Sequence, residues 1–262
     1  MDAQTSEPEL FERILCGVDG TPASLVAVRQ ALRLQDDHGR LILLAVANLA
    51  QAAHAGMAAP HAAELLQHEA EAALAEGQAL APSASSKLLV DDPVAALLGQ
   101  AEAERATLIA VGSHGRRRAA GLLLGTVAAR MLRDATCSVL VARAARDSES
   151  WPQTVVAGVD GSLESAAAFT VARSIAARFG GSVRAVASTR DRLDREAAQA
   201  IAPGLEEHGE SAVNVLAAAS ESADLVVVGS RGLHGLKALG SVSERVAHQA
   251  RSSVLVVRPG HT

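Results

Sequence analysis

The sequence contains no tyrosine, and its other aromatic residues make up only 2% of the 262 residues. Proteins that bind nucleic acid usually combine a basic surface with aromatic side chains that stack on bases. Here the net charge is −5, and the only lysines are Lys87 and Lys237. A nucleic-acid-binding role is therefore not expected.

Long apolar runs are also missing. No run reaches the roughly 20 residues that a membrane-spanning helix needs, and the polar start of the chain lacks the features of a secretion signal. We therefore expect a cytoplasmic protein that does not associate with membranes. Two cysteines, Cys16 and Cys137, lie in apolar runs typical of buried free thiols, so neither a disulfide nor a metal site is expected.

Several catalytic motifs are absent as well. Neither lysine follows a glycine, which excludes a Walker A loop, and there is no HExxH motif and no GxGxxG fingerprint after the first apolar run. The serine- and glycine-rich loop of adenylating α/β enzymes is also missing at that place. An enzyme is therefore not expected, although slow hydrolysis of a bound nucleotide would be compatible with the sequence.

What the sequence does have is an internal repeat. An apolar run ends in Gly-Val-Asp-Gly twice, at Gly17–Gly20 and at Gly158–Gly161. A later run in each copy ends in Gly-Ser-x-Gly, at Gly112–Gly115 and at Gly229–Gly232. Because the repeat is about half the chain long, it predicts two domains, residues 10–145 and residues 152–259.

Each copy alternates short apolar runs with longer amphipathic stretches, which predicts an α/β fold with two tandem, open, doubly wound parallel sheets. Glycine at 39 is expected to follow the end of the first helix. The predicted strands are Arg13–Val18, Leu41–Ala47, Lys87–Val90, Leu108–Val111 and Ser138–Ala142 in the first copy, and Thr154–Val159, Val183–Ala187, Leu225–Val228 and Ser253–Val257 in the second.

The second copy is shorter than the first. Asp19 and Asp160 are 141 positions apart, whereas Gly112 and Gly229 are 117 apart, so 24 residues are lost between these landmarks. The third strand of the second copy is therefore doubtful. The join around Ala144–Pro152 is charged and contains serine, which predicts an exposed linker.

The first copy carries a candidate phosphate loop. Gly112-Ser113-His114-Gly115 is followed, after nine residues, by Gly125-Thr126 at the predicted start of a helix. Glycines allow a ligand to approach the backbone, and the free amides at a helix start attract anions. The intervening residues include Arg116, Arg117 and Arg118, which could neutralise phosphate oxygens. The glycines could equally serve only to turn the chain, and the arginines could form a solvated face.

These motifs resemble those of the universal stress protein family, specifically a tandem member with two domains, and the resemblance covers nearly the whole chain. Nucleotide-binding members have a loop of Gly, two residues, Gly, nine residues, Gly and then Ser or Thr. Gly112, Gly115, Gly125 and Thr126 meet this pattern in full. The resemblance implies a strand order of 3-2-1-4-5 and, in a tandem chain, an internal pseudo-dimer in which the two last strands pair.

The resemblance also implies roles for other residues of the first copy. Asp19, with Gly20 beside it, would contact the adenosine, and the backbone near Val46 would meet the adenine edge. Ser113 and Arg116 belong to the candidate phosphate loop. ATP or another adenine nucleotide, with or without Mg²⁺, is the implied ligand. As an alternative, Asp19 could simply order its own turn or cap the following helix.

The second copy departs from the pattern. Asp160 is kept, as are Gly229 and Gly232, but only seven residues separate Gly232 from Gly240-Ser241, and the arginine run is replaced. These residues form a weaker candidate site than those of the first copy.

Three functions follow as hypotheses. The first is a cytoplasmic stress-response regulator that binds an adenine nucleotide mainly in the first domain. The second is a nucleotide-free tandem scaffold for an unknown protein partner, and the third is an ATP-hydrolysing enzyme. Further assembly into a homodimer is left open by the sequence.

Overall fold

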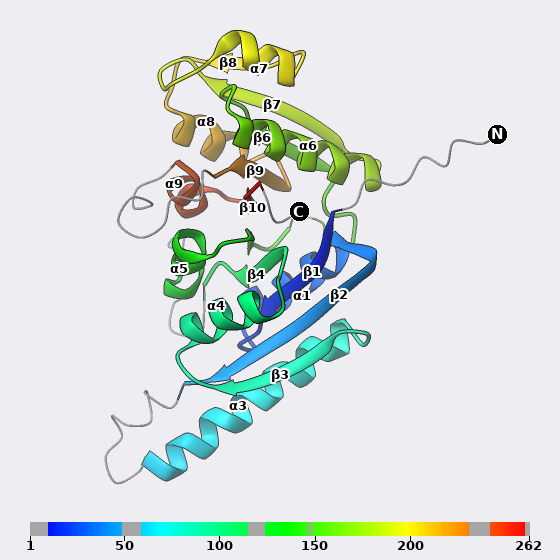
Figure 1. Cartoon of the computed structure of the whole chain (residues 1–262), viewed down its shortest axis with the longest axis vertical. Helices are drawn as coiled ribbons and strands as arrows, with labels where there is room; N and C mark the ends of the chain where they lie inside the picture. The colour runs from blue at the N-terminus through cyan, green and yellow to red at the C-terminus, as the bar shows by residue number, and fades with distance from the viewer. Residues whose placement is uncertain are drawn as a thin grey trace, which may run out of the picture.

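A computed structural model describes residues 10–48, 59–114, 124–145, 147, 149–230 and 242–259 (Figure 1). The strands are β1 Phe11–Gly17, β2 Gln35–Ala47, β3 Ser85–Val90, β4 Leu108–Gly112, β5 Ser138–Ala142, β6 Thr154–Gly158, β7 Ser182–Ser188, β8 Glu206–His208, β9 Leu225–Gly229 and β10 Ser253–Val257. The helices are α1 Pro22–Leu34, α3 Ala59–Leu80, α4 Pro93–Ala103, α5 Thr126–Asp134, α6 Leu163–Arg178, α7 Arg195–Ile201, α8 Ala212–Ala219 and α9 Val242–Gln249.

The strands form one continuous sheet in the order β3-β2-β1-β4-β5-β10-β9-β6-β7-β8. The N-terminal half, β1 to β5, and the C-terminal half, β6 to β10, each have the predicted order 3-2-1-4-5. They meet where β5 pairs with β10, with Leu140 opposite Leu255. This pair is antiparallel and every other pair that the described residues form is parallel, so the predicted pairing of the two last strands is confirmed.

Equivalent caps start the first helix of each half. The hydroxyl of Thr21 accepts a hydrogen bond from the Ser24 amide at 3.2 Å, and Pro22 occupies the first turn of α1. In α6, the hydroxyl of Ser162 accepts from the Ser165 amide, also at 3.2 Å. Side-chain caps of this kind satisfy amides that have no partner inside the helix, so the repeated sequence fixes the same strand-turn-helix unit twice.

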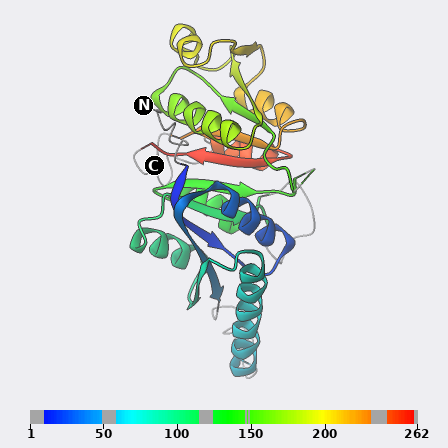
Figure 2. The same cartoon turned by 90° about the vertical axis from the view of Figure 1, so that its right-hand side faces the viewer.

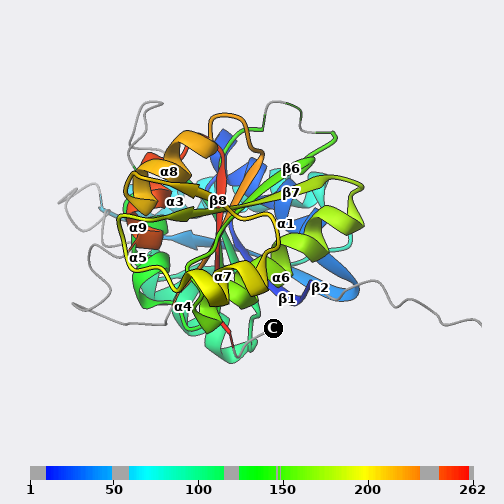
Figure 3. The same cartoon turned by 90° about the horizontal axis from the view of Figure 1, so that it is seen from above.

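Helices cover both faces of the sheet (Figure 3). Buried side chains of α1, α3, α6 and α7 form one core with the strands, and those of α4, α5, α8 and α9 form the other. Figure 2 shows α3 extending away from the β3 end of the sheet. None of the described helices is both long and apolar enough to be a candidate membrane span.

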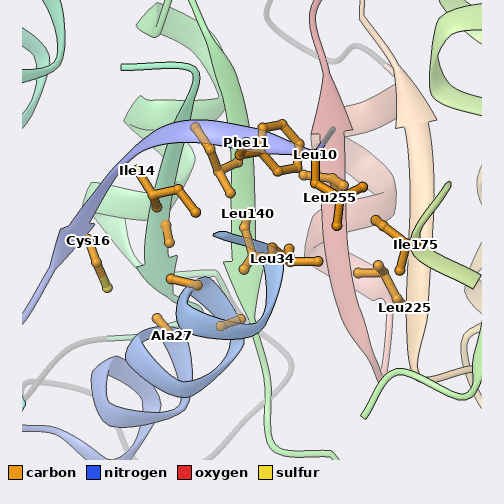
Figure 4. Close-up of a cluster of buried hydrophobic side chains, with 14 of the residues drawn as sticks. Leu10, Phe11, Ile14, Cys16, Ala27, Leu34, Leu140, Ile175, Leu225 and Leu255 are labelled. Carbon is orange, nitrogen blue, oxygen red and sulfur yellow. The ribbon is translucent and has the colours of Figure 1, made fainter. Parts of the chain in front are cut away.

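The first core continues across the junction of the two halves (Figure 4). Leu140 of β5 and Leu255 of β10 are both fully buried, and Phe11 and Ile175, one from each half, belong to the same cluster. Burying a side chain of this size contributes about 1.5–3 kcal/mol. The two halves are therefore held together by apolar packing as well as by strand pairing.

Several expected features differ from those observed. Gly39 does not follow a helix end, because α1 ends at Leu34 and Gly39 lies inside β2, next to Arg40, which pairs with Arg13 of β1. The junction around Ala144–Pro152 is exposed only in part, since Trp151 is 1% exposed and packs in the core. The doubtful third strand of the second half exists as the three-residue β8, which pairs with β7.

Candidate functional site

Asp19 follows β1 and orders the turn into α1. Its Oδ1 accepts hydrogen bonds from the amide of Thr21 at 3.0 Å and from the Thr21 hydroxyl at 2.6 Å. Gly20, between them, has a φ of 74°, a conformation that glycine adopts without strain. The alternative in which Asp19 orders its own turn therefore describes part of its role.

The same turn is built at the start of the second half. Oδ1 of Asp160 accepts from the Ser162 amide at 3.0 Å and from the Ser162 hydroxyl at 2.5 Å. Gly161 has a φ of 87°. The two Gly-Val-Asp-Gly motifs thus specify the same local geometry.

Gly112, at the end of β4, packs directly on the first turn of α1. A Cβ atom added there would lie 2.7 Å from the carbonyl carbon of Ala23 and 2.8 Å from the amide nitrogen of Ser24. Real Cβ atoms do not approach backbone this closely, so glycine is required at this position. The Asp19 amide in turn donates a hydrogen bond to the Ser24 hydroxyl at 3.3 Å. The ends of β1 and β4 are therefore joined through the start of α1.

Ser113 closes the base of the candidate phosphate loop. Its amide donates to the carbonyl of Ala142 at 3.0 Å, and its carbonyl accepts from the amide of Gly125 at 2.7 Å. Its side chain is 3% exposed, and its Oγ lies 3.0 Å from Nδ1 of His114. The bond to Gly125 brings the start of α5 back to the carboxyl end of β4.

The residue that begins α5 is a glycine and supplies no side-chain cap to the helix. Gly125 is the capping residue, with extended backbone at φ −70° and no side-chain hydrogen bond, and Thr126 is the exposed first residue of the helix. The amides of a first helical turn point outward and favour an anion. Gly115 and Arg116, predicted to complete this loop, lie outside the described residues.

Val46 lies near the carboxyl end of β2, opposite Leu89 of β3, and is half-buried. Because β1, β2 and β4 run parallel, their carboxyl ends share one edge of the sheet. The structure therefore places Asp19, Gly20, Val46, Gly112, Ser113, Gly125 and Thr126 along that edge of the N-terminal half. In open α/β sheets this is the edge at which ligands bind.

The weaker candidates of the second half divide into two groups. Asp160 and Gly229 lie at the corresponding edge, and a Cβ atom at Gly229 would lie 2.3 Å from the carbonyl oxygen of Glu164 in the first turn of α6. Because of this close contact, Gly229 is required for packing in the same way as Gly112. Gly232, Gly240 and Ser241 lie outside the described residues.

Sequence reasoning missed two features of this region. Ser24 links the Asp19 turn to the end of β4, although the signal was only its place three residues after a capping threonine. The segment between β7 and β8, with helix α7, was not assigned. Its signal was Asp194, which begins α7 by accepting from the Ala197 amide at 3.2 Å.

The cysteines are not suited to nucleophilic chemistry. Burial raises the pKa of the Cys16 thiol to about 12 and that of Cys137 to about 11, so both thiols are protonated at neutral pH. Among the residues that the structure describes, no group of three or more histidine, cysteine, aspartate or glutamate side chains is arranged to hold a metal ion.

Comparison with known proteins gives a consistent result. The model of the universal stress protein family matches residues 10–143 and 204–258. One universal stress protein of Mycobacterium tuberculosis is 29% identical over an alignment of 312 positions, which covers 95% of this chain and 97% of that protein. Another from the same organism is 33% identical over 206 positions, covering 67% and 69% of the two chains. The crystal structure of a universal stress protein from Archaeoglobus fulgidus has the same fold, with a TM-score of 0.72 at 21% identity over 94% of this chain and 96% of that one.

Proposed function

Because this chain belongs to the universal stress protein family, we propose that it is a cytoplasmic stress-response regulator that binds an adenine nucleotide at the carboxyl edge of its N-terminal half. The ligand is ATP or a related adenine nucleotide, with or without Mg²⁺, and it acts by binding and not by being consumed in catalysis. The proposed binding domain comprises residues 10–145, and residues 152–259 form its structural partner.

The observation that carries this proposal is the hydrogen bond between the Gly125 amide and the Ser113 carbonyl, at 2.7 Å. This bond holds the start of α5, where Gly125 supplies no side-chain cap, against the end of β4. Gly112 packs the same end of β4 on Ser24, whose hydroxyl accepts from the Asp19 amide. Amides at the helix start would bind phosphate oxygens, and the Asp19 carboxylate would accept hydrogen bonds from ribose hydroxyls. Arginine side chains of the intervening loop would neutralise phosphate charge.

The adenine base would lie near the end of β2, around Val46. The chain has no tyrosine and only four other aromatic residues, three phenylalanines and one tryptophan. Phe11, Phe169, Phe179 and Trp151 all pack in or against the core. We therefore propose that aliphatic side chains and backbone hydrogen bonds hold the base, so base selectivity depends on main-chain groups.

The substitution Gly125→Asp tests the phosphate assignment. An aspartate at this position can accept hydrogen bonds from the α5 amides, so it preserves the helix while occupying the anion position and repelling phosphate. The extended backbone of Gly125 accommodates a side chain. We expect ATP affinity, measured by isothermal titration calorimetry, to fall by at least about tenfold, or about 1.4 kcal/mol of binding free energy.

Gly99→Asp is the matched control, because a Cβ atom at Gly99 meets nothing within 4 Å and the residue lies in α4. It should leave ATP affinity unchanged. Equal affinities of wild-type protein, Gly125→Asp and Gly99→Asp would refute the phosphate assignment. Failure of the wild-type protein to bind any adenine nucleotide would favour the alternative function, a nucleotide-free scaffold.

A further inference from the structure

The C-terminal half carries a segment across the edge where its own nucleotide would bind. This strap, residues Thr189–Asp194, leaves the carboxyl end of β7 and leads into α7. Strand register places Ser188, the last residue of β7, at the position that Val46 holds in β2: Gly158 pairs with Val186, as Gly17 pairs with Leu44. The strap therefore begins where the base is proposed to lie in the other half.

The first end of the strap is fastened to β7 and α8. The hydroxyl of Ser188 donates to the Glu210 carbonyl at 2.6 Å, and the amides of Arg190 and Asp191 point back to the same hydroxyl at 3.2 and 3.1 Å. Oδ2 of Asp191 accepts from the Ala212 amide at 2.6 Å, in the first turn of α8. The strap thus supplies its own carboxylate to a helix start that would otherwise favour an external anion.

The second end of the strap lies on the turn after β6. The amide of Asp194 donates to the carbonyl of Asp160 at 3.0 Å. A Cβ atom at Gly161 would lie 2.6 Å from the Asp194 carbonyl oxygen and 2.8 Å from the Asp194 Cβ atom. The strap backbone is therefore in direct contact with the residues that correspond to Asp19 and Gly20.

Helix α7 anchors the strap in the core. Ala198 is fully buried and Ala202, just beyond the helix, is 1% exposed, and both belong to the cluster shared with β6 and α6. Leu193, within the strap, is half-buried against the same cluster. Opening the strap would expose these apolar contacts as well as breaking its hydrogen bonds.

From this arrangement we propose that the strap occupies the carboxyl edge of the C-terminal half in place of a ligand, so that the chain binds one nucleotide and not two. The strap spans the ends of β7 and β6, the path along which base and ribose would have to lie. This inference rests on the proposed nucleotide binding of the N-terminal half only for its stoichiometry. The closure itself is independent of any ligand.

Hydrogen exchange in the absence of nucleotide tests the closure directly. In wild-type protein we expect the amides of Asp194 and Ala212 to be protected. Gly161→Ala forces a methyl group against the Asp194 backbone and should speed exchange at Asp194 by at least about tenfold. Gly204→Ala is the matched control: its φ of 94° gives similar backbone strain, but its Cβ atom meets nothing within 4 Å.

If Gly161→Ala does not fold, Asp191→Ala gives the same test, because Asp191 is exposed and its loss removes the acceptor of the Ala212 amide. Rapid exchange at Asp194 in the wild-type protein, or equal effects of Gly161→Ala and Gly204→Ala together with no effect of Asp191→Ala, would overturn the closure.

Titration with ATP supplies the second arm. One nucleotide per chain is expected, and two would overturn the strap as an occupant even if the strap is protected. No binding at all would refute the proposed function while the exchange experiment still decides whether the C-terminal edge is closed.

Discussion

At the scale of single residues, the geometry that the two halves share depends on glycines, and the physical reason for glycine differs from one position to another. Gly161 needs a positive φ and also has a close neighbour, whereas Gly112 is restricted by the backbone of α1 alone. A residue assigned to ligand binding from the sequence can thus be required for packing. The roles are compatible, because the same close approach that excludes a side chain brings β4 to the Asp19 turn.

Gly112→Ala should destabilise the protein. The added methyl group would meet the backbone of Ala23 and Ser24, and overpacking of this kind costs about 1–3 kcal/mol. Gly99→Ala, in an open position of α4, should instead stabilise by up to about 1 kcal/mol because alanine favours a helix. Urea unfolding followed by the fluorescence of the buried Trp151 measures both. Equal unfolding free energies for the two variants would contradict the packing at Gly112.

The buried thiols predict a defined pH dependence. Burial raises the pKa of Cys16 from its ordinary value of 9.0 to about 12, so between these values the unfolded chain loses a proton that the folded chain keeps. The contribution of this group to stability is complete below about pH 9 and is lost as pH rises toward 12. At pH 8, a thiol reagent should label neither Cys16 nor Cys137 in the native protein and both in urea. Labelling of Cys16 without unfolding would contradict its burial.

At the scale of elements, the junction of the two halves is fastened by a reciprocal pair of arginines, one after each last strand. The amide of Arg143 donates to the Ser253 hydroxyl at 3.0 Å, and the amide of Arg258 donates to the Ser138 hydroxyl at 3.2 Å. Each guanidinium then reaches the last turn of a helix in the other half. Arg143 donates to the carbonyl of Ala247 in α9 at 2.6 Å.

The second arginine is the more deeply buried. The Arg258 guanidinium donates to the carbonyl of Cys137 at 2.7 Å and to that of Leu132, in the last turn of α5, at 2.5 Å. Burial lowers its pKa, while the negative end of the helix dipole favours a cation there. Without this side chain, two carbonyls at the junction would lose their charged donor.

Arg258→Met should therefore lower the free energy of unfolding by about 1.5–3 kcal/mol, the usual cost of losing hydrogen bonds to a charged group. The unfolding free energy of Arg258→Lys should lie between those of Arg258→Met and the wild type, because an ammonium group keeps the charge but cannot reproduce the planar, forked donors of a guanidinium. Arg251→Met, at an exposed position close in sequence, is the control. A urea midpoint for Arg258→Met equal to that of the control would mean that the junction does not depend on this contact.

The regular elements could be predicted from the sequence because apolar runs, capping residues and glycines specify them locally. For this reason the sequence predicts helices around Ala23–Gln35, Thr126–Arg133 and Leu163–Phe179, which agree with α1, α5 and α6 to within one residue at each end. Three features could not be predicted. The early start of β2 depends on pairing with β1, β8 is only three residues long, and α7, with seven residues, is too short to show a clear hydrophobic period.

The candidate site was predictable only in part for a similar reason. Sequence spacing indicates Gly112, Gly125 and Thr126, since a loop and a helix start are local patterns. The packing of Gly112 on Ser24 and the hydrogen bond from the Asp194 amide to the Asp160 carbonyl join segments that are far apart in the chain. The bond from the Gly125 amide to the Ser113 carbonyl depends on how the loop between them folds back. Nothing in a single sequence reports such contacts.

At the scale of the whole molecule, one sheet and one shared core support two edges that are related by the repeat but differ in their contacts. In the C-terminal half, a strap anchored by α7 lies on the strand ends. In the N-terminal half, the Gly125 amide holds the start of α5 at the end of β4, and Gly112 packs that end on Ser24, which accepts from the Asp19 amide. This is the arrangement expected if, as proposed, one copy of a duplicated fold binds nucleotide and the other supports it.

The most direct test is to compare hydrogen exchange of the full chain with and without saturating ATP. If nucleotide binds only in the N-terminal half, exchange should slow in peptides that contain Asp19–Ser24 and Gly112–Ala128, with no change in peptides that contain Asp160–Ser165. Protection in the Asp160–Ser165 region, or no protection in either half, would contradict it.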